Sequence, residues 1–222
     1  VVDEAHLIAL WGQDFRPHWG RIGEVQSLVP SRVPITLASA TAPDPILTVM
    51  KKSVHITDSN HLFVNIGNFR PNLVWEARVM RERASLSERL AFMVPENPSP
   101  ANFFPNECAL VYVNTRTDAC EVLDAIRKRL PAELRPMVQV FHALRGTLTK
   151  AWILYYMFLK LLRILICTEA AGMGCDFSGV HLVVHYLAPK SLISWVQRAG
   201  RGGRDGKRCL CLLLVEPGIV KE

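Results

Sequence analysis

The sequence predicts an α/β protein built from parallel β-sheets with flanking helices. Short, continuously apolar runs occur along the 222 residues, and such runs are typical of strands buried on both faces. At least one amphipathic helix lies between them, and polar or glycine-rich motifs follow several of the runs directly. Ligands bind at the carboxyl ends of parallel strands, and these motifs fall at such strand ends.

The expected strands follow from the apolar runs in chain order. Val1 and Val2 end a strand that delivers Asp3, and a Ser85–Glu88 capping box opens a helix before a loop over 95–106. The remaining runs predict strands over 33–38, 73–79, 108–113, 164–167 and 182–185.

Two helical stretches are expected in the second half of the chain. Residues 118–130 are amphipathic, with Val122, Ile126 and Leu130 on one face. The run over 152–167 is strongly apolar but contains Lys160 and Arg163, and it is shorter than the roughly 18–20 apolar residues of a membrane span. We interpret it as a buried helix that runs into a buried strand.

Composition narrows the class of partner. Lys and Arg number 26 against 20 Asp and Glu, a net charge of +6 that favours a polyanion. The six cysteines form no C-x-x-C pair, so zinc ligation lacks its usual spacing and no zinc site is expected. Reduced, buried thiols point to the cytosol or nucleus, and no secretion signal is visible.

The first motif is Asp3-Glu4-Ala5-His6, at the end of a strand. One carboxylate there could hold Mg²⁺ while the other polarises a water molecule, although a solvated acidic turn would look similar. A second motif, Ser39-Ala40-Thr41, also follows a strand. Its hydroxyls fit either a helix N-cap or a mechanical coupling element.

Two glycine-rich motifs lie near the end of the chain. Residues 197–206 read QRAGRGGRDG, which suits a backbone close to a triphosphate with guanidinium groups that neutralise developing charge. A flexible basic turn that binds any anion is the alternative. Residues 168–176 read TEAAGMGCD, where Gly-x-Gly could approach a phosphate and Asp176 a ribose hydroxyl, or where a tight turn is sufficient.

Aromatic residues follow the acidic motif in WGQDFRP. Trp11 and Phe15, interleaved with Arg16, could stack on unpaired bases, although Trp11 could equally be a core residue. His142 is interpreted as a histidine satisfied within the core.

Taken in order, these segments resemble RecQ-like DNA helicases of superfamily 2. VVDEAHLIALWGQDFRPHWGRIG resembles helicase motif II with its aromatic-rich loop, and SAT resembles motif III. ALVYVNTR, TEAAGMGCD and QRAGRGGRDG resemble motifs IV, V and VI. FRPNLVWEA at 69–77 resembles the passage between the two RecA-like lobes, which implies a partial first lobe over 1–68 and a complete second lobe over 69–222.

The resemblance implies an ATP- and Mg²⁺-dependent motor that moves 3′ to 5′ on single-stranded DNA. Asp3 would hold Mg²⁺ through water, and Glu4 would orient and deprotonate the attacking water. Arg201 and Arg204 would reach the γ-phosphate, with Arg204 as the arginine finger.

Other roles are implied for the residues around these groups. His6 and Gln197 would link the lobes across the nucleotide, and Ser39 and Thr41 would couple the lobes. Nucleotide contacts would come from Gly172, Gly174, Asp176 and Gly200. DNA contacts would come from Trp11, Phe15, Arg16, Thr115, Arg116 and Thr168.

The sequence also departs from the family pattern. No G-x-x-x-x-G-K-[ST] occurs in it, so the lysine that cradles the β- and γ-phosphates is missing and little autonomous ATPase activity is expected. YYMFLKLL replaces a polar helix and its turn, and the family's zinc-binding and winged-helix regions are missing. We therefore expect a truncated helicase, or alternatively a non-catalytic DNA-binding remnant. An RNA helicase is a third reading; nuclear residence and a role in DNA repair or recombination follow from the family alone.

Overall fold

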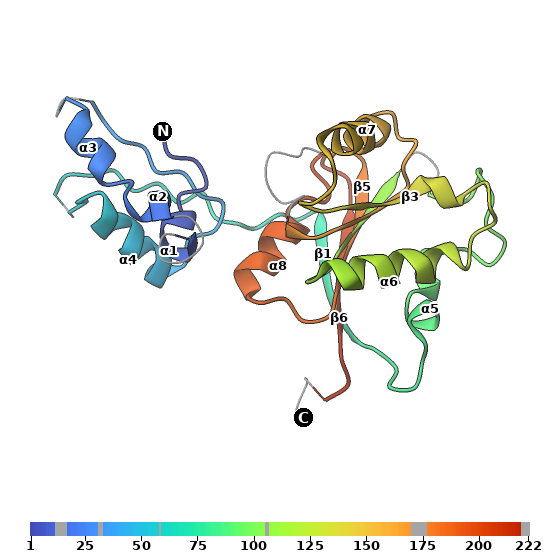
Figure 1. Cartoon of the computed structure of the whole chain (residues 1–222). Helices are drawn as coiled ribbons and strands as arrows, with labels where there is room; N and C mark the ends of the chain where they lie inside the picture. The colour runs from blue at the N-terminus through green and yellow to red at the C-terminus, as the bar shows by residue number, and fades with distance from the viewer. Residues whose placement is uncertain (12–16, 31–32, 58, 105–106, 170–176, 219–222) are drawn as a thin grey trace. The chain divides into compact units, whose positions relative to one another are not determined.

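The computed structural model divides the chain into two compact units, Val1–Phe69 (unit 1) and Arg70–Glu222 (unit 2). We describe each unit by itself (Figure 1). The structure describes all residues except 12–16, 31–32, 58, 105–106, 170–176 and 219–222, and it leaves out the side chains at 11, 17, 26 and 27.

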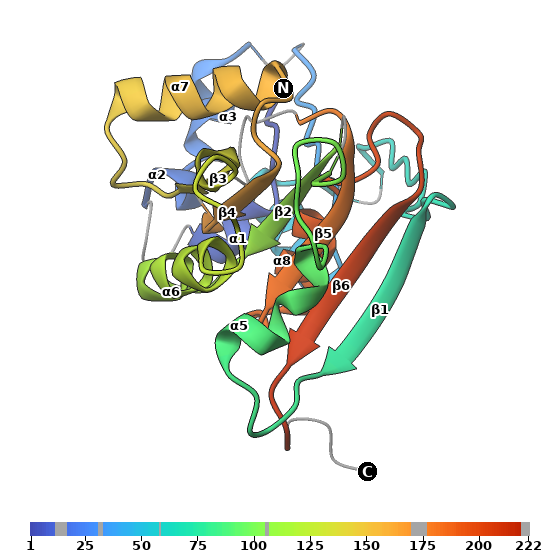
Figure 2. The same ribbon diagram turned by 90° about the vertical axis from the view of Figure 1, so that its right-hand side faces the viewer.

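Unit 2 contains a six-stranded sheet in which every pairing is parallel, which confirms the predicted α/β class. The strand order is β1-β6-β5-β2-β4-β3, so the chain crosses over repeatedly (Figure 2). The bounds are β1 Leu73–Val79, β2 Cys108–Tyr112, β3 Val138–Phe141, β4 Ile164–Cys167, β5 Val180–Tyr186 and β6 Cys209–Val215.

Helices cover both faces of this sheet, and α6 and α7 lie on opposite sides of it (Figure 1). Alternating strand residues point into two buried clusters: Val122 and Ile126 of α6 pack into one, and Ile153 and Met157 of α7 into the other. The bounds are α5 Leu86–Arg89, η1 Ala91–Met93, α6 Arg116–Arg127, η2 Arg135–Met137, α7 Thr147–Phe158 and α8 Leu192–Ala199.

The prediction of a buried helix in the apolar stretch from 152 is wrong in one respect. A helix does form there, but only Ile153 and Met157 are buried on it. Trp152 and Phe158 are 57% and 79% exposed. Twelve residues cannot bury every side chain against a single sheet face, because an α-helix presents its residues around its whole circumference. None of the described helices has the length and apolar character needed to cross a membrane.

The described part of unit 1 contains short helices joined by long stretches without regular secondary structure. The prediction of a strand over 33–38 is also wrong, because the region forms only an isolated parallel bridge between Val2 and Leu37. A strand needs a run of ladder pairs, and here only three backbone hydrogen bonds connect the two segments around that bridge, Val2–Thr36, Ala38–Val2 and Ala5–Ala38. The helices are α1 Leu7–Trp11, α2 Pro17–Gly20, α3 Glu24–Leu28 and α4 Asp44–Ser53.

Candidate nucleotide site

The acidic motif of unit 1 sits on a backbone that is held in an uncommon conformation. Glu4 has φ of 51°, in the left-handed region that non-glycine residues rarely adopt. The next residue, Ala5, donates its N–H to the carbonyl of Ala38 at 2.9 Å, which ties the turn to the segment before Ser39. Such strained residues cluster at functional sites, so the backbone supports a functional role for this turn.

The two motifs of unit 1 meet through His6 and Ser39. The His6 Nδ1 and Ser39 Oγ atoms are 3.0 Å apart, and the Ser39 hydroxyl also donates to the carbonyl of Thr41 at 3.0 Å. The residue before α4 that would cap it is Pro43, and no side chain caps this helix. Ser39 is therefore not an N-cap, and its hydroxyl instead joins the Ser-Ala-Thr motif to the acidic motif.

Burial controls the ionisation of His6. His6 is 3% exposed, and this burial lowers its pKa, with Glu4 and then Asp3 opposing the shift. The His6 Nδ1 atom lies 3.5 Å from Oε2 of Glu4. A largely neutral imidazole can therefore orient the carboxylate turn without carrying a permanent charge.

Asp3 and Glu4 fit the ligand chemistry of Mg²⁺. Asp3 is exposed, Glu4 is partly exposed, and the Glu4 backbone N–H donates to one Asp3 carboxylate oxygen at 2.8 Å. Mg²⁺ usually keeps several waters and takes one or two carboxylates, so an accessible pair such as this suits it. No group of three or more metal-ligating side chains occurs in the described part of the chain.

In unit 2 the glycine- and arginine-rich loop after α8 is fixed by residues at the start of the unit. Arg70 donates to the carbonyls of Gly200 and Gly203 at 2.9 and 2.5 Å. Asn72 donates to the carbonyls of Gly203 and Lys207 at 2.7 and 2.8 Å. Arg70 and Asn72 thus shape the loop that carries Arg201 and Arg204.

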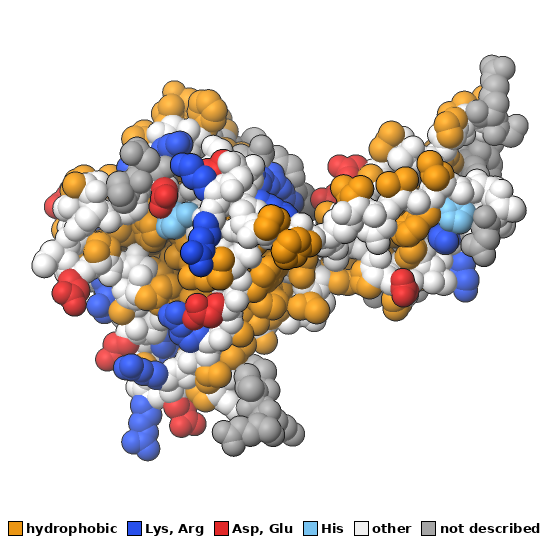
Figure 3. Space-filling view, turned by 180° about the vertical axis from the view of Figure 1, so that it is seen from behind, with side chains coloured by type: hydrophobic (Ala, Val, Ile, Leu, Met, Phe, Trp, Pro, Cys, Tyr) orange, Lys and Arg blue, Asp and Glu red, His pale blue; other side chains and the backbone are white. Residues whose placement is uncertain are grey.

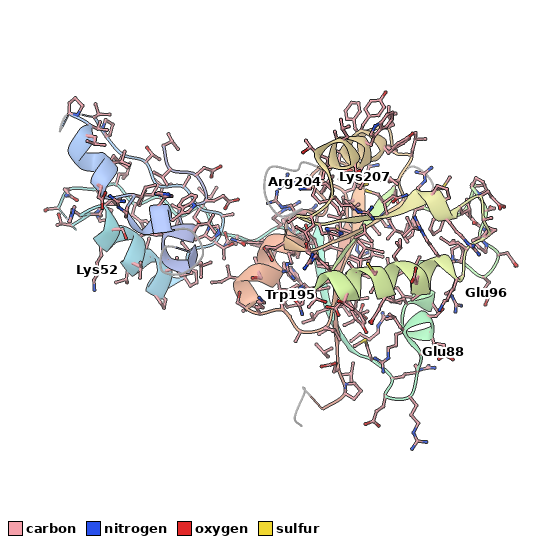
Figure 4. The ribbon with its side chains drawn as sticks, in the orientation of Figure 1. Lys52, Glu88, Glu96, Trp195, Arg204 and Lys207 are labelled. Atoms are coloured by element: carbon pink, nitrogen blue, oxygen red, sulfur yellow. The ribbon has the colours of Figure 1, made fainter. Side chains whose placement is uncertain are left out.

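Two glycines of this loop are required by space and conformation. A Cβ at Gly202 would lie 2.3 Å from the Cys209 sulfur, and Gly203 has φ of +56° with the Asn72 amide nitrogen 2.5 Å from a Cβ position. A side chain at either position would displace the loop. The compact turn leaves Arg204 exposed, beside Lys207 (Figure 4).

A buried network joins the loop to the strand ends. Arg198, 5% exposed, pairs with the Glu169 carboxylate and donates to Nε2 of His185. Its guanidinium carbon lies 5.4 Å from the centre of the Tyr112 ring. The last turn of α8, β5, β2 and the residues after β4 are therefore held together at one point.

The network selects one form of His185. Its Nδ1–H donates to the carbonyl of Leu187 at 2.8 Å, which leaves Nε2 as the acceptor for Arg198. Burial and, to a smaller extent, the Arg198 charge together lower the pKa of His185 to about 4, against an opposing effect of the hydrogen bond to Leu187. The folded structure therefore requires the neutral imidazole.

This requirement predicts acid sensitivity between pH 6.5 and about 4. The folded pKa of His185 is about 4 against 6.5 for the free side chain, so the unfolded chain binds the proton first as pH falls. The stabilisation from neutral His185 is fully present above pH 6.5, and about 3 kcal/mol is lost as pH falls to 4. We expect urea unfolding across this range to show that slope, and His185→Gln to flatten it; an unchanged slope in His185→Gln would contradict this assignment.

The other predicted site residues are placed as follows. Gln197 and Arg201 are partly buried at the end of α8 and just beyond it. The Thr115 hydroxyl accepts the N–H of Asp118 as the N-cap of α6, and Arg116 begins that helix with an exposed side chain. Thr168 is partly buried after β4. Phe15, Arg16, Gly172, Gly174, Asp176 and the side chain of Trp11 lie outside the described residues.

Sequence reasoning missed several residues that build this site. Arg198 and Glu169 lie inside recognised motifs, but no local spacing shows that they pair. Arg70 and Asn72 contact a loop about 130 positions later in the chain. The one sequence signal for Arg70 and Asn72 was the resemblance of FRPNLVWEA to the passage between the two lobes.

The known proteins to which this chain is similar are helicases. Residues 101–206 match the family model described as the helicase conserved C-terminal domain. The chain is similar to the RecQ-like DNA helicase blm-1 of Caenorhabditis elegans, with 28% identity over 96% of this chain and 20% of the relative. It is similar to the probable ATP-dependent DNA helicase RecS of Bacillus subtilis, with 26% identity over 98% of this chain and 41% of the relative.

A solved structure supports the same fold. S. cerevisiae Dbp5 bound to RNA and ADP BeF3 matches 96% of this chain and 52% of its own, with a TM-score of 0.68 and 19% identity. Unit 2 thus has the helicase C-terminal type of domain. The chain as a whole is RecQ-like, because its similarity to the RecQ relatives extends along nearly its full length. It spans only a fifth to two fifths of those two relatives.

Proposed function

We propose that this chain forms part of a RecQ-type, ATP-dependent 3′–5′ DNA helicase motor. One observation carries the proposal: Arg70 and Asn72 fix the backbone of the loop that presents Arg204, while Arg198 ties the preceding helix to the strand ends. Positioning and electrostatic stabilisation supply nearly all catalysis of phosphoryl transfer. A rigid loop with an exposed arginine is suited to that task.

The residues would divide the chemistry between the two units. Glu4 would orient the attacking water and accept its proton, and His6 would hold the Glu4 turn through Ser39. Arg204 and Arg201 would neutralise charge on the transferred phosphoryl group. Asp3 would hold Mg²⁺, which when bound offsets the charge of the phosphate oxygens. Trp11, Phe15, Arg16, Thr115, Arg116 and Thr168 would contact DNA.

The 222 residues lack the phosphate-binding lysine motif, so we propose that the isolated chain turns over little ATP. The rival is a non-catalytic DNA-binding remnant, which the exposed apolar face of α7 favours. Both forms would bind single-stranded DNA through phosphate contacts. They differ in whether the nucleotide state changes that binding.

We expect millimolar AMP-PNP with Mg²⁺ to change the affinity of the chain for fluorescein-labelled oligo(dT) about fivefold, because a motor couples the two ligands. Fluorescence anisotropy measures the Kd with and without nucleotide. Arg204→Ala should keep the nucleotide-free Kd but lose the shift. An affinity that depends steeply on salt and ignores the nucleotide would favour the remnant instead.

A further inference from the structure

Unit 2 contains a second concentration of arginine, around a cavity of about 490 Å³ at the ends of β1 and β6 beside α5. Basic side chains, with some acidic ones among them, gather over the end of unit 2 that carries α5 (Figure 3). None of the predicted nucleotide- or DNA-binding residues lines this cavity. Its charged lining residues are Arg78, Arg81, Glu88, Arg89 and Arg129.

The single lining carboxylate does not balance the four guanidinium groups. Glu88 accepts the backbone N–H and the hydroxyl of Ser85 at 2.7 and 2.8 Å, which engages it in the cap of α5. Arg78 has its own partner outside the lining, Glu76, at 2.7 Å. The remaining positive charges converge from three chain segments, and like charges that share a concave surface repel one another unless an anion lies between them.

Local contacts hold two of these arginines in place. The guanidinium of Arg78 lies over the Phe92 ring, 5.4 Å from its centre. Arg89 donates through one terminal nitrogen to the carbonyl of Glu82 at 3.1 Å. The buried Nε of Arg89 has no hydrogen-bond partner among the described residues. The Arg89 side chain also hydrogen-bonds Tyr186, so contacts with two residues fix its position at the cavity.

We infer that this cavity binds a phosphate-bearing ligand. Guanidinium groups match phosphate oxygens with paired hydrogen bonds, and several together suit a ligand with more than one negative charge. The volume lies within the range of small-ligand sites. The phosphates belong either to a nucleic-acid strand or to a free polyphosphate. This inference does not depend on the proposed motor, because the two sets of residues do not overlap.

The sequence offers a matched pair of variants for the test. Arg81→Gln/Arg129→Gln removes two lining charges, whereas Arg83→Gln/Lys128→Gln removes two exposed charges close by in the sequence that do not line the cavity. Both changes lower the net charge equally. Binding of tripolyphosphate is measured by calorimetry, and binding of labelled oligo(dT) by anisotropy over a salt series, after circular dichroism confirms that each variant is folded.

We expect the lining variant to bind at least one probe about tenfold more weakly. If the nucleic-acid strand uses the cavity, the salt slope of oligo(dT) binding should also fall by about one. The control pair should change the Kd less than about twofold. Loss for tripolyphosphate alone identifies a free polyphosphate ligand, and loss for oligo(dT) alone identifies the nucleic-acid strand. Equal behaviour of the two variants with both probes overturns the inference.

Discussion

Arg204→Ala should lower ATP turnover about a thousandfold once the missing phosphate-binding segment is supplied, because an arginine that neutralises the transferring phosphoryl group contributes that much or more. The assay uses a chimera in which the upstream lobe of the B. subtilis relative RecS precedes Val1. DNA-stimulated turnover is followed by phosphate release. Arg204 is exposed on a loop whose backbone is fixed by Arg70 and Asn72, so the substitution should remove the charge and leave the loop in place.

Two companion variants sharpen this result. Arg208→Ala removes another exposed arginine, four positions further along the same connection to β6, and should change turnover less than about threefold. Glu4→Gln should lose activity on the same scale as Arg204→Ala, because it removes the proposed base without changing the size of the side chain. Retention of a tenth or more of the activity in Arg204→Ala would rule out its role as the arginine finger.

Arg198→Ala should cost about 3 kcal/mol in the free energy of unfolding, because it removes a buried cation that holds three partners. Glu169 would lose its ion-pair partner, His185 its hydrogen-bond donor and Tyr112 the group that covers its ring. The measurement is a urea titration followed by circular dichroism at pH 7.5, where His185 is neutral.

A second substitution separates the contributions. Glu169 is about half exposed, so Glu169→Gln leaves a polar group in water and should cost less than about 1 kcal/mol. Arg198→Lys keeps the charge but loses the planar fork that contacts both partners, and should fall between the two. A cost for Arg198→Ala no larger than that for Glu169→Gln would show that the network does not hold the helix to the sheet.

The sequence predicted those elements of unit 2 whose signal is local. The strands over 73–79 and 164–167 were predicted at their observed bounds, and the Ser85 capping box is present. The helix expected over 118–130 begins two residues earlier, because Thr115 caps it, and ends three residues earlier, at Arg127. β3 and β6 were not among the expected strands, and β3 has only four residues, too few to carry a periodic signal.

What could not be predicted depends on contacts distant in the chain. The apolar residues of α7 indicated burial, yet which of them face the sheet is decided by where the helix packs. The motifs gave the candidate nucleotide residues, but the residues that position them, Arg70, Asn72 and Arg198, are defined by partners that a local pattern does not identify. Residue spacing along the chain therefore identifies candidate catalytic and binding residues better than it identifies the residues that hold them in position.

The placement of β1 has a consequence for synthesis on the ribosome. β1 lies at the edge of the sheet, and its one neighbour is β6, so Leu73 cannot pair until Cys209 has been synthesised. Nascent chains shorter than that would carry an unpaired β1 and an incompletely paired β5, and exposed strand edges recruit other chains. Completion of this sheet is therefore tied to β6, its last strand in chain order, so products that stop before β6 should be prone to aggregate.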